Sequence, residues 1–216
     1  DGTEVTLTIL SNQKTSDVTV TRGALDTSAF YEIRKQGNVS FGYIELSTFG
    51  TDTAKQVETA LEMFKKKNIQ TLVIDLRDNG GGYLTAATDI LDLFFTSDEV
   101  IYQMKEKNSA AKKYYAESDK KYEFENGYIL VNENTASASE LTAGALQSEK
   151  GYQLIGKTTY GKGSAQTQKT LSDGSVLKYT YAKWMIPNGT CINGKGLTPD
   201  EEVDNVIWVI NKLLEP

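Results

Sequence analysis

The stretch IQTLVIDLRDNGGG, residues 69–82, decides the fold of this chain. Its first part, residues 69–76, is nearly all apolar in the middle, as expected for a β-strand that is buried on both faces of a sheet. The strand runs directly into the polar glycine turn 77–82. After the turn, apolar side chains recur at helical spacing, at Leu84, Ala87, Ile90, Leu91 and Phe94. A buried strand, a glycine turn and a helix in this order predict an α/β fold.

Strand and helix patterns alternate on both sides of this stretch. Further strands are predicted at residues 5–9, 17–22, 39–46, 128–131 and 153–155, and a long β-hairpin arm at 175–186. Further helices are predicted at residues 53–67, 141–146 and 203–214. Thr53 and Gln56 form a possible capping box at the start of the first of these helices. The interspersed charges of residues 104–126 predict a solvated hairpin or flap.

Composition narrows the function classes. The chain has 216 residues, of which 39% are hydrophobic, enough for one substantial domain. A net charge of −6 argues against a nucleic-acid partner, because phosphate binding normally needs a basic face. The single cysteine, Cys191, excludes an intrachain disulfide framework, and the absence of histidine excludes a zinc site of the HExxH type. We therefore expect no metal and no cofactor.

The absence of histidine also makes Ser137 and Lys162 the most informative pair in the chain. A serine hydroxyl becomes a good nucleophile only when a neighbouring base takes its proton, and histidine is the usual base. Lysine can replace it where burial or a positive neighbour favours its neutral form. The pair raises the hypothesis of a Ser-Lys hydrolase.

Each of these residues also has a simpler interpretation. Ser137 or Ser139 can cap a helix, and Lys162 can be an ordinary solvated lysine. The glycines of the turn 77–82 can serve only to allow positive φ angles, although such a turn can also present N–H groups to an oxyanion.

A phosphate-binding loop is the main rival function for Lys162. Residues 156–163, GKTTYGKG, match the pattern G-x-x-x-x-G-K-[ST] except at the last position, where Gly163 lacks the hydroxyl that would bind magnesium. No helix is predicted after the loop, so the phosphates would also lose their helix N-terminus. The sequence argues against nucleotide binding.

Taken together, these segments resemble the C-terminal processing peptidases, or tail-specific proteases. The stretches that carry the resemblance are FGYIELSTF (41–49), VIDLRDNGGG (73–82), VNENTASASE (131–140), TYGKGSAQ (159–166), PNGT (187–190) and GLTPD (196–200). They occur in the family's order across roughly residues 39–203. The resemblance implies a core of ββα units, similar to the Clp peptidase and crotonase folds, with an added β-hairpin arm.

The resemblance also assigns roles to individual residues. It implies Ser137 as the nucleophile, Lys162 as the general base and Gln166 as the residue that orients the lysine. The oxyanion hole would be the backbone N–H groups of Ala138 and, in the glycine turn, Gly81. The implied reaction is cleavage of proteins or peptides near their C-termini through an acyl-enzyme.

The family normally carries a PDZ domain before this core. Residues 1–10 resemble only the last strand of such a domain, which leaves residues 11–216 as the peptidase core. Thr135 replaces the first serine common in the family's motif, at a position away from the reacting oxygen. The chain begins inside a β-rich region, so we expect that an N-terminal targeting or tethering segment has been removed.

Two other functions stay open at this point. The first is an inactive module on the same fold that holds peptides by β-augmentation, and the second, a crotonase-type acyl-CoA enzyme, gives no reason for the Ser137–Lys162 spacing. The resemblance implies protein or peptide partners with accessible C-terminal tails and a location outside the bacterial cytoplasm or in plastids. It leaves self-association into a homo-oligomer open.

Overall fold

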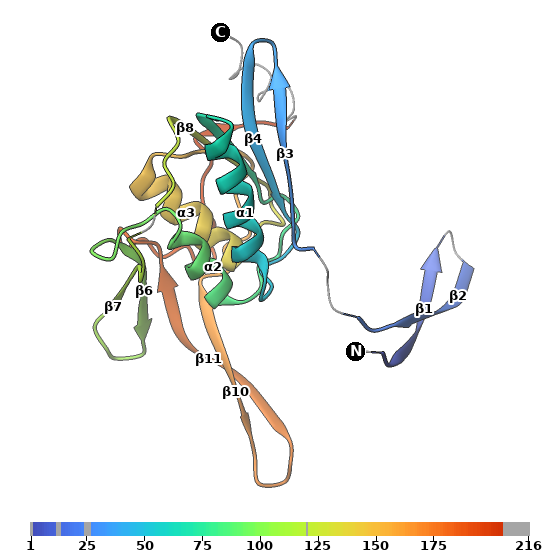
Figure 1. Ribbon diagram of the computed structural model, residues 1–216. Helices are drawn as coiled ribbons and strands as arrows, with labels where there is room; N and C mark the ends of the chain where they lie inside the picture. The colour runs from blue at the N-terminus through green and yellow to red at the C-terminus, as the bar shows by residue number, and fades with distance from the viewer. Residues whose placement is uncertain (1, 12–13, 24–26, 120, 205–216) are drawn as a thin grey trace.

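A computed structural model describes residues 2–11, 14–23, 27–119 and 121–204 (Figure 1). The helix predicted at residues 203–214 lies almost wholly outside this part of the chain. Within it, strands and helices alternate as expected for an α/β protein, and the predicted fold class is confirmed.

The centre of the molecule is a six-stranded sheet with the order β12-β9-β8-β5-β4-β3. Its strands are β3 (Ala29–Gln36), β4 (Val39–Leu46), β5 (Thr71–Asp75), β8 (Asn126–Val131), β9 (Gln153–Gly156) and β12 (Glu201–Glu202). All neighbours are parallel except β3 and β4. Every residue of β5 is buried, as the apolar run predicted. Parallel strands point their carboxyl ends to one edge, and the turns after β5 and β8 meet there.

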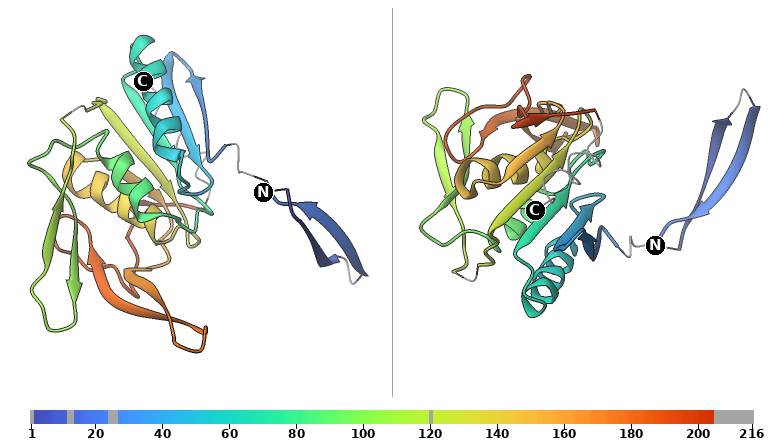
Figure 2. Two further views of the ribbon diagram at one scale, coloured as in Figure 1. Left: turned by 60° about the horizontal axis from the view of Figure 1, so that its bottom comes forward. Right: turned by 90° about the horizontal axis from the view of Figure 1, so that it is seen from above.

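Three helices cover one face of this sheet: α1 (Thr53–Lys66), α2 (Leu84–Leu91) and α3 (Ala138–Lys150). Figure 2 shows α2 and α3 side by side over the strands. Alternate residues of β5 divide between the two faces of the sheet: Leu72 and Ile74 join the helix-covered core, and Val73 joins a smaller cluster on the opposite face. The ββα unit formed by β3, β4 and α1 agrees with the predicted architecture.

The capping box predicted for α1 is wrong. The helix begins after Asp52 without a side-chain cap, and Thr53 Oγ1 instead accepts a hydrogen bond from the Gly50 N–H at 2.8 Å. Gln56 Oε1 accepts hydrogen bonds from the N–H groups of Ser28 and Ala29, at 3.0 and 2.9 Å. Gln56 therefore fixes the start of β3, a strand that the sequence did not predict.

A second sheet holds four strands in the order β10-β11-β6-β7. They are β6 (Val100–Glu106), β7 (Lys112–Tyr115), β10 (Ser164–Thr170) and β11 (Val176–Met185). The hairpin arm predicted at 175–186 is present, but that range forms only its second strand, β11, and its first strand, β10, lies earlier in the chain than predicted. The two strands extend away from the helices in Figure 1. The predicted hairpin at 104–126 is also present, but its first strand begins earlier, at Val100.

At the N-terminal end, β1 (Glu4–Ser11) pairs along its whole length with β2 (Lys14–Thr21). Among the described strands, these two pair only with each other. The domain boundary expected after residue 10 falls at the tip of this hairpin. The assignment of β1 to a PDZ domain stays a prediction.

Candidate active site

Ser137 occupies the turn between β8 and α3, at the N-cap of the helix. Its backbone has φ 60° and ψ −117°, a combination that costs a non-glycine residue on the order of 1–3 kcal/mol. Buried hydroxyls on either side hold the turn: Thr135 Oγ1 donates to the Leu76 carbonyl at 2.8 Å, and Ser139 Oγ donates to the Asn79 carbonyl at 2.9 Å. Ser137 thus occupies the N-cap position of α3, as its simpler interpretation required, within a sharp strand-to-helix bend of the kind that can present a nucleophile.

The glycine turn after β5 lies directly against this bend. Asn79 anchors it, because its side chain donates to the Leu46 carbonyl at 2.7 Å and accepts from the Gly81 N–H at 2.9 Å. A Cβ on Gly81 would lie 2.8 Å from Ser137 Cβ and 2.9 Å from the Ala138 nitrogen. The structure therefore places Gly81 beside Ser137, with its N–H already bound by Asn79.

Among the described residues, the N–H groups of Gly82 and Ala138, unlike that of Gly81, are free to bind a ligand. Both residues line the groove that contains Ser137. Neither N–H donates to an acceptor within the described part of the chain. Ala138 is the first residue of α3, where helix geometry leaves N–H groups without an intrahelical acceptor.

Glu140 joins the two halves of the site, a role that sequence reasoning missed. Its carboxylate is fully buried and accepts four hydrogen bonds. One oxygen accepts from the N–H groups of Ser137 and Lys162, both at 2.8 Å. The other accepts from the Gly161 N–H and from Thr159 Oγ1, both at 2.6 Å. The spacing Ser137-x-x-Glu140 is that of a capping box, which predicts the first contact but not the three with the lysine loop.

The loop that carries Lys162 is held by close backbone packing. Gly161 has φ 88°, and a Cβ there would lie 2.7 Å from the Gly196 nitrogen. A Cβ on Gly163 would lie 2.8 Å from the Asn193 nitrogen. The glycines on both sides of Lys162 thus allow the loop to pack against the segment 192–196.

The side chain of Lys162 is exposed, in contrast to its backbone. Within the described residues, no hydrogen bond joins Lys162 to Ser137 or to Gln166. Gln166 is also exposed, and its Nε2 lies 3.5 Å from Thr180 Oγ1, a long and weak contact. The structure brings the predicted residues to one place without the contacts between their side chains.

That place is a groove of about 490 Å³. Ser137, Ala138, Lys162 and Gln166 all line it. Its apolar walls come from four side chains on separate elements: Leu84, Met104, Leu141 and Trp184. Polar side chains along β10 and β11, among them Gln168 and Lys178, form the rest of the lining. A groove that combines apolar walls with polar groups is a candidate substrate site.

A buried polar cluster fixes the strand end that leads into the glycine turn. Asp75, at the end of β5, accepts hydrogen bonds from both the Arg77 guanidinium, at 2.6 Å, and the Tyr43 hydroxyl, at 2.7 Å. Burial, together with the hydrogen bond to Asp75, raises the pKa of the Tyr43 phenol well above its usual range. The hydrogen bond to Asp75 likewise raises the pKa of Arg77. The cluster keeps its formal charges paired, which holds the first residue of the turn in position.

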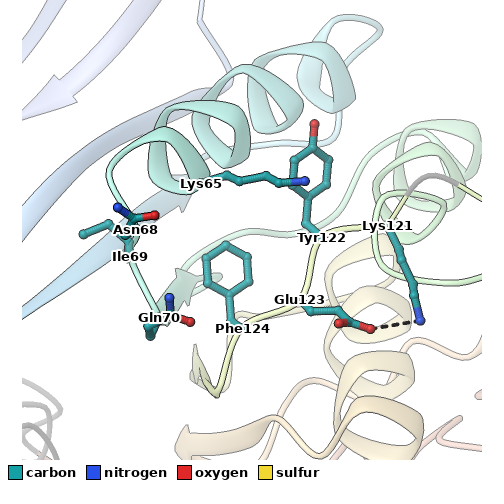
Figure 3. A pocket seen from close by; sticks show the side chains of 8 residues that line it. All are labelled: Lys65, Asn68, Ile69, Gln70, Lys121, Tyr122, Glu123 and Phe124. Carbon is teal, nitrogen blue, oxygen red and sulfur yellow. Dashed lines mark ion pairs between the residues drawn. The ribbon is translucent and has the colours of Figure 1, made fainter.

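Another hollow, of about 330 Å³, lies at the opposite ends of the strands (Figure 3). Lys65 from the end of α1, Gln70 before β5 and Phe124 before β8 line it, together with an ion pair of 2.9 Å between Lys121 and Glu123. It contains none of the predicted catalytic residues.

The other candidate chemistries find little support in the geometry. The segment after the near-match to a phosphate loop is strand β10, so that loop lacks the helix N-terminus that would hold phosphates. The part of the chain that the structure describes contains no cluster of three or more histidine, cysteine, aspartate or glutamate side chains able to hold a metal. Cys191 is a partly buried free thiol. No described helix is long and apolar enough to cross a membrane.

The fold and site define an α/β domain in which a serine at a helix N-terminus and a lysine share one groove. The family model "Peptidase family S41" matches residues 40–203, and the chain belongs to this family. The carboxy-terminal processing protease CtpB of Bacillus subtilis is 40% identical over 175 residues, which are 81% of this chain and 36% of that protein.

Two further relatives agree. A protein of Staphylococcus saprophyticus named "Probable CtpA-like serine protease" is 35% identical over 94% of this chain and 41% of its own length. The solved structure of a photosystem II D1 C-terminal processing protease superimposes with a TM-score of 0.75 and 29% identity, covering 93% of this chain and 55% of that one. The chain thus spans less than half the length of the two curated relatives, the Bacillus and Staphylococcus proteins.

Proposed function

We propose that this chain is the catalytic core of a serine endopeptidase that cleaves proteins or peptides near their C-termini. The observation that carries the proposal is the shared carboxylate of Glu140, which holds the backbones of both Ser137 and Lys162 at the mouth of one groove. The names of the relatives, which are C-terminal processing and serine proteases, support the same reaction.

In the proposed reaction, neutral Lys162 removes the proton of Ser137 Oγ, and Oγ attacks the carbonyl carbon of the scissile peptide bond. The C–N bond then breaks, and Lys162 gives the proton to the leaving amine. Water, activated by the same lysine, hydrolyses the acyl-enzyme and restores Ser137. Gln166 turns from Thr180 to orient the lysine ammonium.

The oxyanion of each tetrahedral intermediate needs two N–H donors. Ala138 supplies one, because its N–H starts α3 and has no acceptor among the described residues. We assign the second to Gly82 in place of Gly81, whose N–H is occupied by Asn79. Loss of either donor is expected to reduce kcat by about 100- to 1,000-fold.

Replacement of each member of the dyad tests this function. Ser137→Ala and Lys162→Ala are each expected to reduce peptide cleavage by more than about 1,000-fold while the far-UV circular dichroism stays unchanged. Lys157→Ala is the matched control, since Lys157 lies in the same loop but forms an ion pair with Asp204 at the surface. Near-wild-type turnover in either dyad variant would refute the assignment.

A fluorophosphonate probe distinguishes this function from an inactive peptide-binding module. Only an activated serine reacts with such a probe, so Ser137 of the wild type should become labelled and that of the Lys162→Ala variant should not.

We further propose that β1 is the last strand of a PDZ domain, because β1 pairs with the neighbouring β2 and with no other described strand. The whole protein would then act on chains with accessible C-terminal tails, outside the cytoplasm and tethered by an N-terminal segment. Fractionation of cells that produce the full-length protein tests this location.

A further inference from the structure

Strand β10 is an open edge of the four-stranded sheet, and it begins two residues after Lys162. It hydrogen-bonds to β11 on one side, and no described strand pairs with its other side (Figure 1). Such an edge presents unpaired N–H and C=O groups that can pair with another chain.

The ladder shows which residues face outward. Near the two ends of β10, the Gly163 carbonyl accepts from the Trp184 N–H at 3.0 Å, and the Leu171 N–H donates to the Ser175 carbonyl at 2.8 Å. In an antiparallel ladder the direction of the backbone groups alternates along the strand. The ladder has one bulge, but its extra residue, Tyr181, lies on β11, so the alternation along β10 is not interrupted. The odd-numbered residues of β10 thus face β11, and the even-numbered ones direct their N–H and C=O groups outward. These are Ser164, Gln166, Gln168 and Thr170.

The same strand forms one wall of the catalytic groove. Five consecutive residues, 164–168, line the groove together with Ser137 and Lys162. A chain that lay in the groove would therefore run alongside the free edge of β10.

From this placement we propose that β10 is the substrate platform: an extended polypeptide pairs with its outer edge as a fifth strand. This inference rests on the proposed peptidase function. Backbone pairing would give affinity without regard to sequence, while the apolar walls would receive alternate side chains.

We assign the substrate an antiparallel direction, because antiparallel pairing is slightly more stable per residue. Strand β10 leads away from the dyad, from Ser164 to Thr170. The residues on the N-terminal side of the scissile bond then lie along β10, and the carbonyl to be attacked lies near Ser137. Residues on the C-terminal side of the cut extend beyond the strand.

A scan of N-methylated substrates tests the platform on the wild-type enzyme. Single N-methyl groups are placed in turn at each of the six peptide nitrogens that precede the scissile bond. A methyl group removes a donor and blocks strand pairing, so kcat/KM should fall by about tenfold or more at alternate positions and change little at those between. Recognition through side chains alone would show no period of two, and that result would overturn the proposal.

A proline substitution tests the protein side. Gln168→Pro removes one outward N–H from an edge strand, where proline does not disturb the existing ladder. It should reduce kcat/KM about tenfold. The control is Lys113→Pro on the opposite edge of the sheet, where the Ala116 N–H bonds inward to the Glu99 carbonyl and so places the Lys113 N–H outward. Equal kcat/KM in the two variants, with equal thermal stability, would contradict the platform.

Binding of the same N-methylated peptides is measured by fluorescence anisotropy. Together with Ser137 labelling and cleavage, it distinguishes failure of the peptidase function from failure of substrate pairing with β10. Ser137 labelling and cleavage without the alternating pattern would leave the peptidase function intact and refute the platform. Alternating binding without labelling or cleavage would refute the peptidase function and retain β10 as a peptide-binding edge.

Discussion

The turn that holds Ser137 and the loop that holds Lys162 differ in how much of each is held by hydrogen bonds and packing. Around Ser137, the hydroxyls of Thr135 and Ser139 are fully buried and hydrogen-bonded to backbone carbonyls of other segments. Around Lys162, only the backbone is fixed, through Gly161, Gly163 and the carboxylate of Glu140. The lysine side chain itself is exposed.

This difference indicates which part of the proposed site must move. The nucleophile and the candidate oxyanion donors are held by backbone geometry, which is costly to rearrange. The base and its orienting residue differ from a catalytic arrangement by side-chain rotation, and exposed side chains rotate on the picosecond to nanosecond scale. Glu140 is common to both halves, so the loop backbone keeps its distance from Ser137 while the side chain is free.

A substitution beside the Ser137 turn, which is held by backbone geometry, should have the largest effect on kcat. Gly81→Ala places a Cβ 2.8 Å from both Ser137 Cβ and the Ala136 carbonyl oxygen, at a φ of 99° that side chains disfavour. We expect kcat to fall by at least about 100-fold, since a displacement near 1 Å at a reacting group has that effect.

Gly80→Ala provides the control in the same turn, because a Cβ there meets no atom within 4 Å. It should keep near-wild-type turnover. A comparable loss in both variants would show that the turn is sensitive to any substitution, and the close packing of Gly81 on Ser137 would not be the cause.

A change in the shared carboxylate should come next. Glu140→Gln replaces one acceptor oxygen with an NH₂ group, which would face N–H donors such as those of Ser137 and Gly161. Each buried donor left without an acceptor costs about 1–3 kcal/mol. We expect kcat to fall by about 30- to 100-fold with a smaller change in KM, because the dyad backbones separate. Steady-state peptide cleavage assays measure kcat and KM, and chemical denaturation measures the change in stability.

Thr159→Val sharpens this prediction, since it removes one of the four donors to Glu140 and leaves the carboxylate in place. It also removes the acceptor of the Leu197 N–H, at 2.7 Å, so its effect on stability is measured alongside kcat. A loss of about tenfold in kcat is expected. Glu149→Gln, on an exposed position of the same helix, should change neither activity nor stability. If Glu140→Gln lost stability but kept wild-type kcat, the carboxylate would be structural only.

The flexible side should respond less. Gln166→Ala removes the side chain proposed to orient Lys162, and we expect kcat to fall about tenfold while the free energy of unfolding stays unchanged, because Gln166 is exposed and weakly bonded. Gln153→Ala, at an exposed position of β9, serves as the control. Full activity of Gln166→Ala across the pH range would remove Gln166 from the mechanism.

The sequence predicted the central strands because burial on both faces leaves a continuous apolar run, as in β5. It failed for β3, an edge strand in which Phe30 and Ile33 are exposed and the apolar alternation is lost. It also misassigned Gln56, whose partners in β3 are 27 and 28 residues away, beyond the reach of a local capping pattern.

The same limit applies to the site. Local spacing left simpler interpretations of Ser137 and Lys162 open, and the family resemblance selected Ser137, Ala138, Lys162 and Gln166, which all line one groove. The contacts of Glu140 with Thr159, Gly161 and Lys162 join positions 19 to 22 residues apart, and only tertiary structure shows them. Likewise, Gly81 and Gly82 are equivalent in sequence, and only the bond from Gly81 to Asn79 distinguishes them.

The smallest effect on kcat should come from a change at the C-terminal end of α3. Such a change tests whether loosening the helix, without altering the turn at Ser137, affects activity. Lys150 in its last turn bonds Glu99 at 2.6 Å, and Glu99 also accepts from the Thr96 N–H at 2.7 Å. Burial raises the pKa of Glu99, but the Lys150 and Thr96 hydrogen bonds outweigh it and hold that pKa below its usual value. The pair therefore stabilises the fold above the unfolded-state pKa, and that contribution disappears as the pH falls through the lower folded-state pKa.

Glu99→Gln should reduce the free energy of unfolding modestly at pH 7, with the difference from wild type vanishing in acid, while kcat stays within about twofold. Denaturation at several pH values checks this, and a large loss of kcat would mean that the geometry of Ser137 depends on the whole of α3 instead of its first turn.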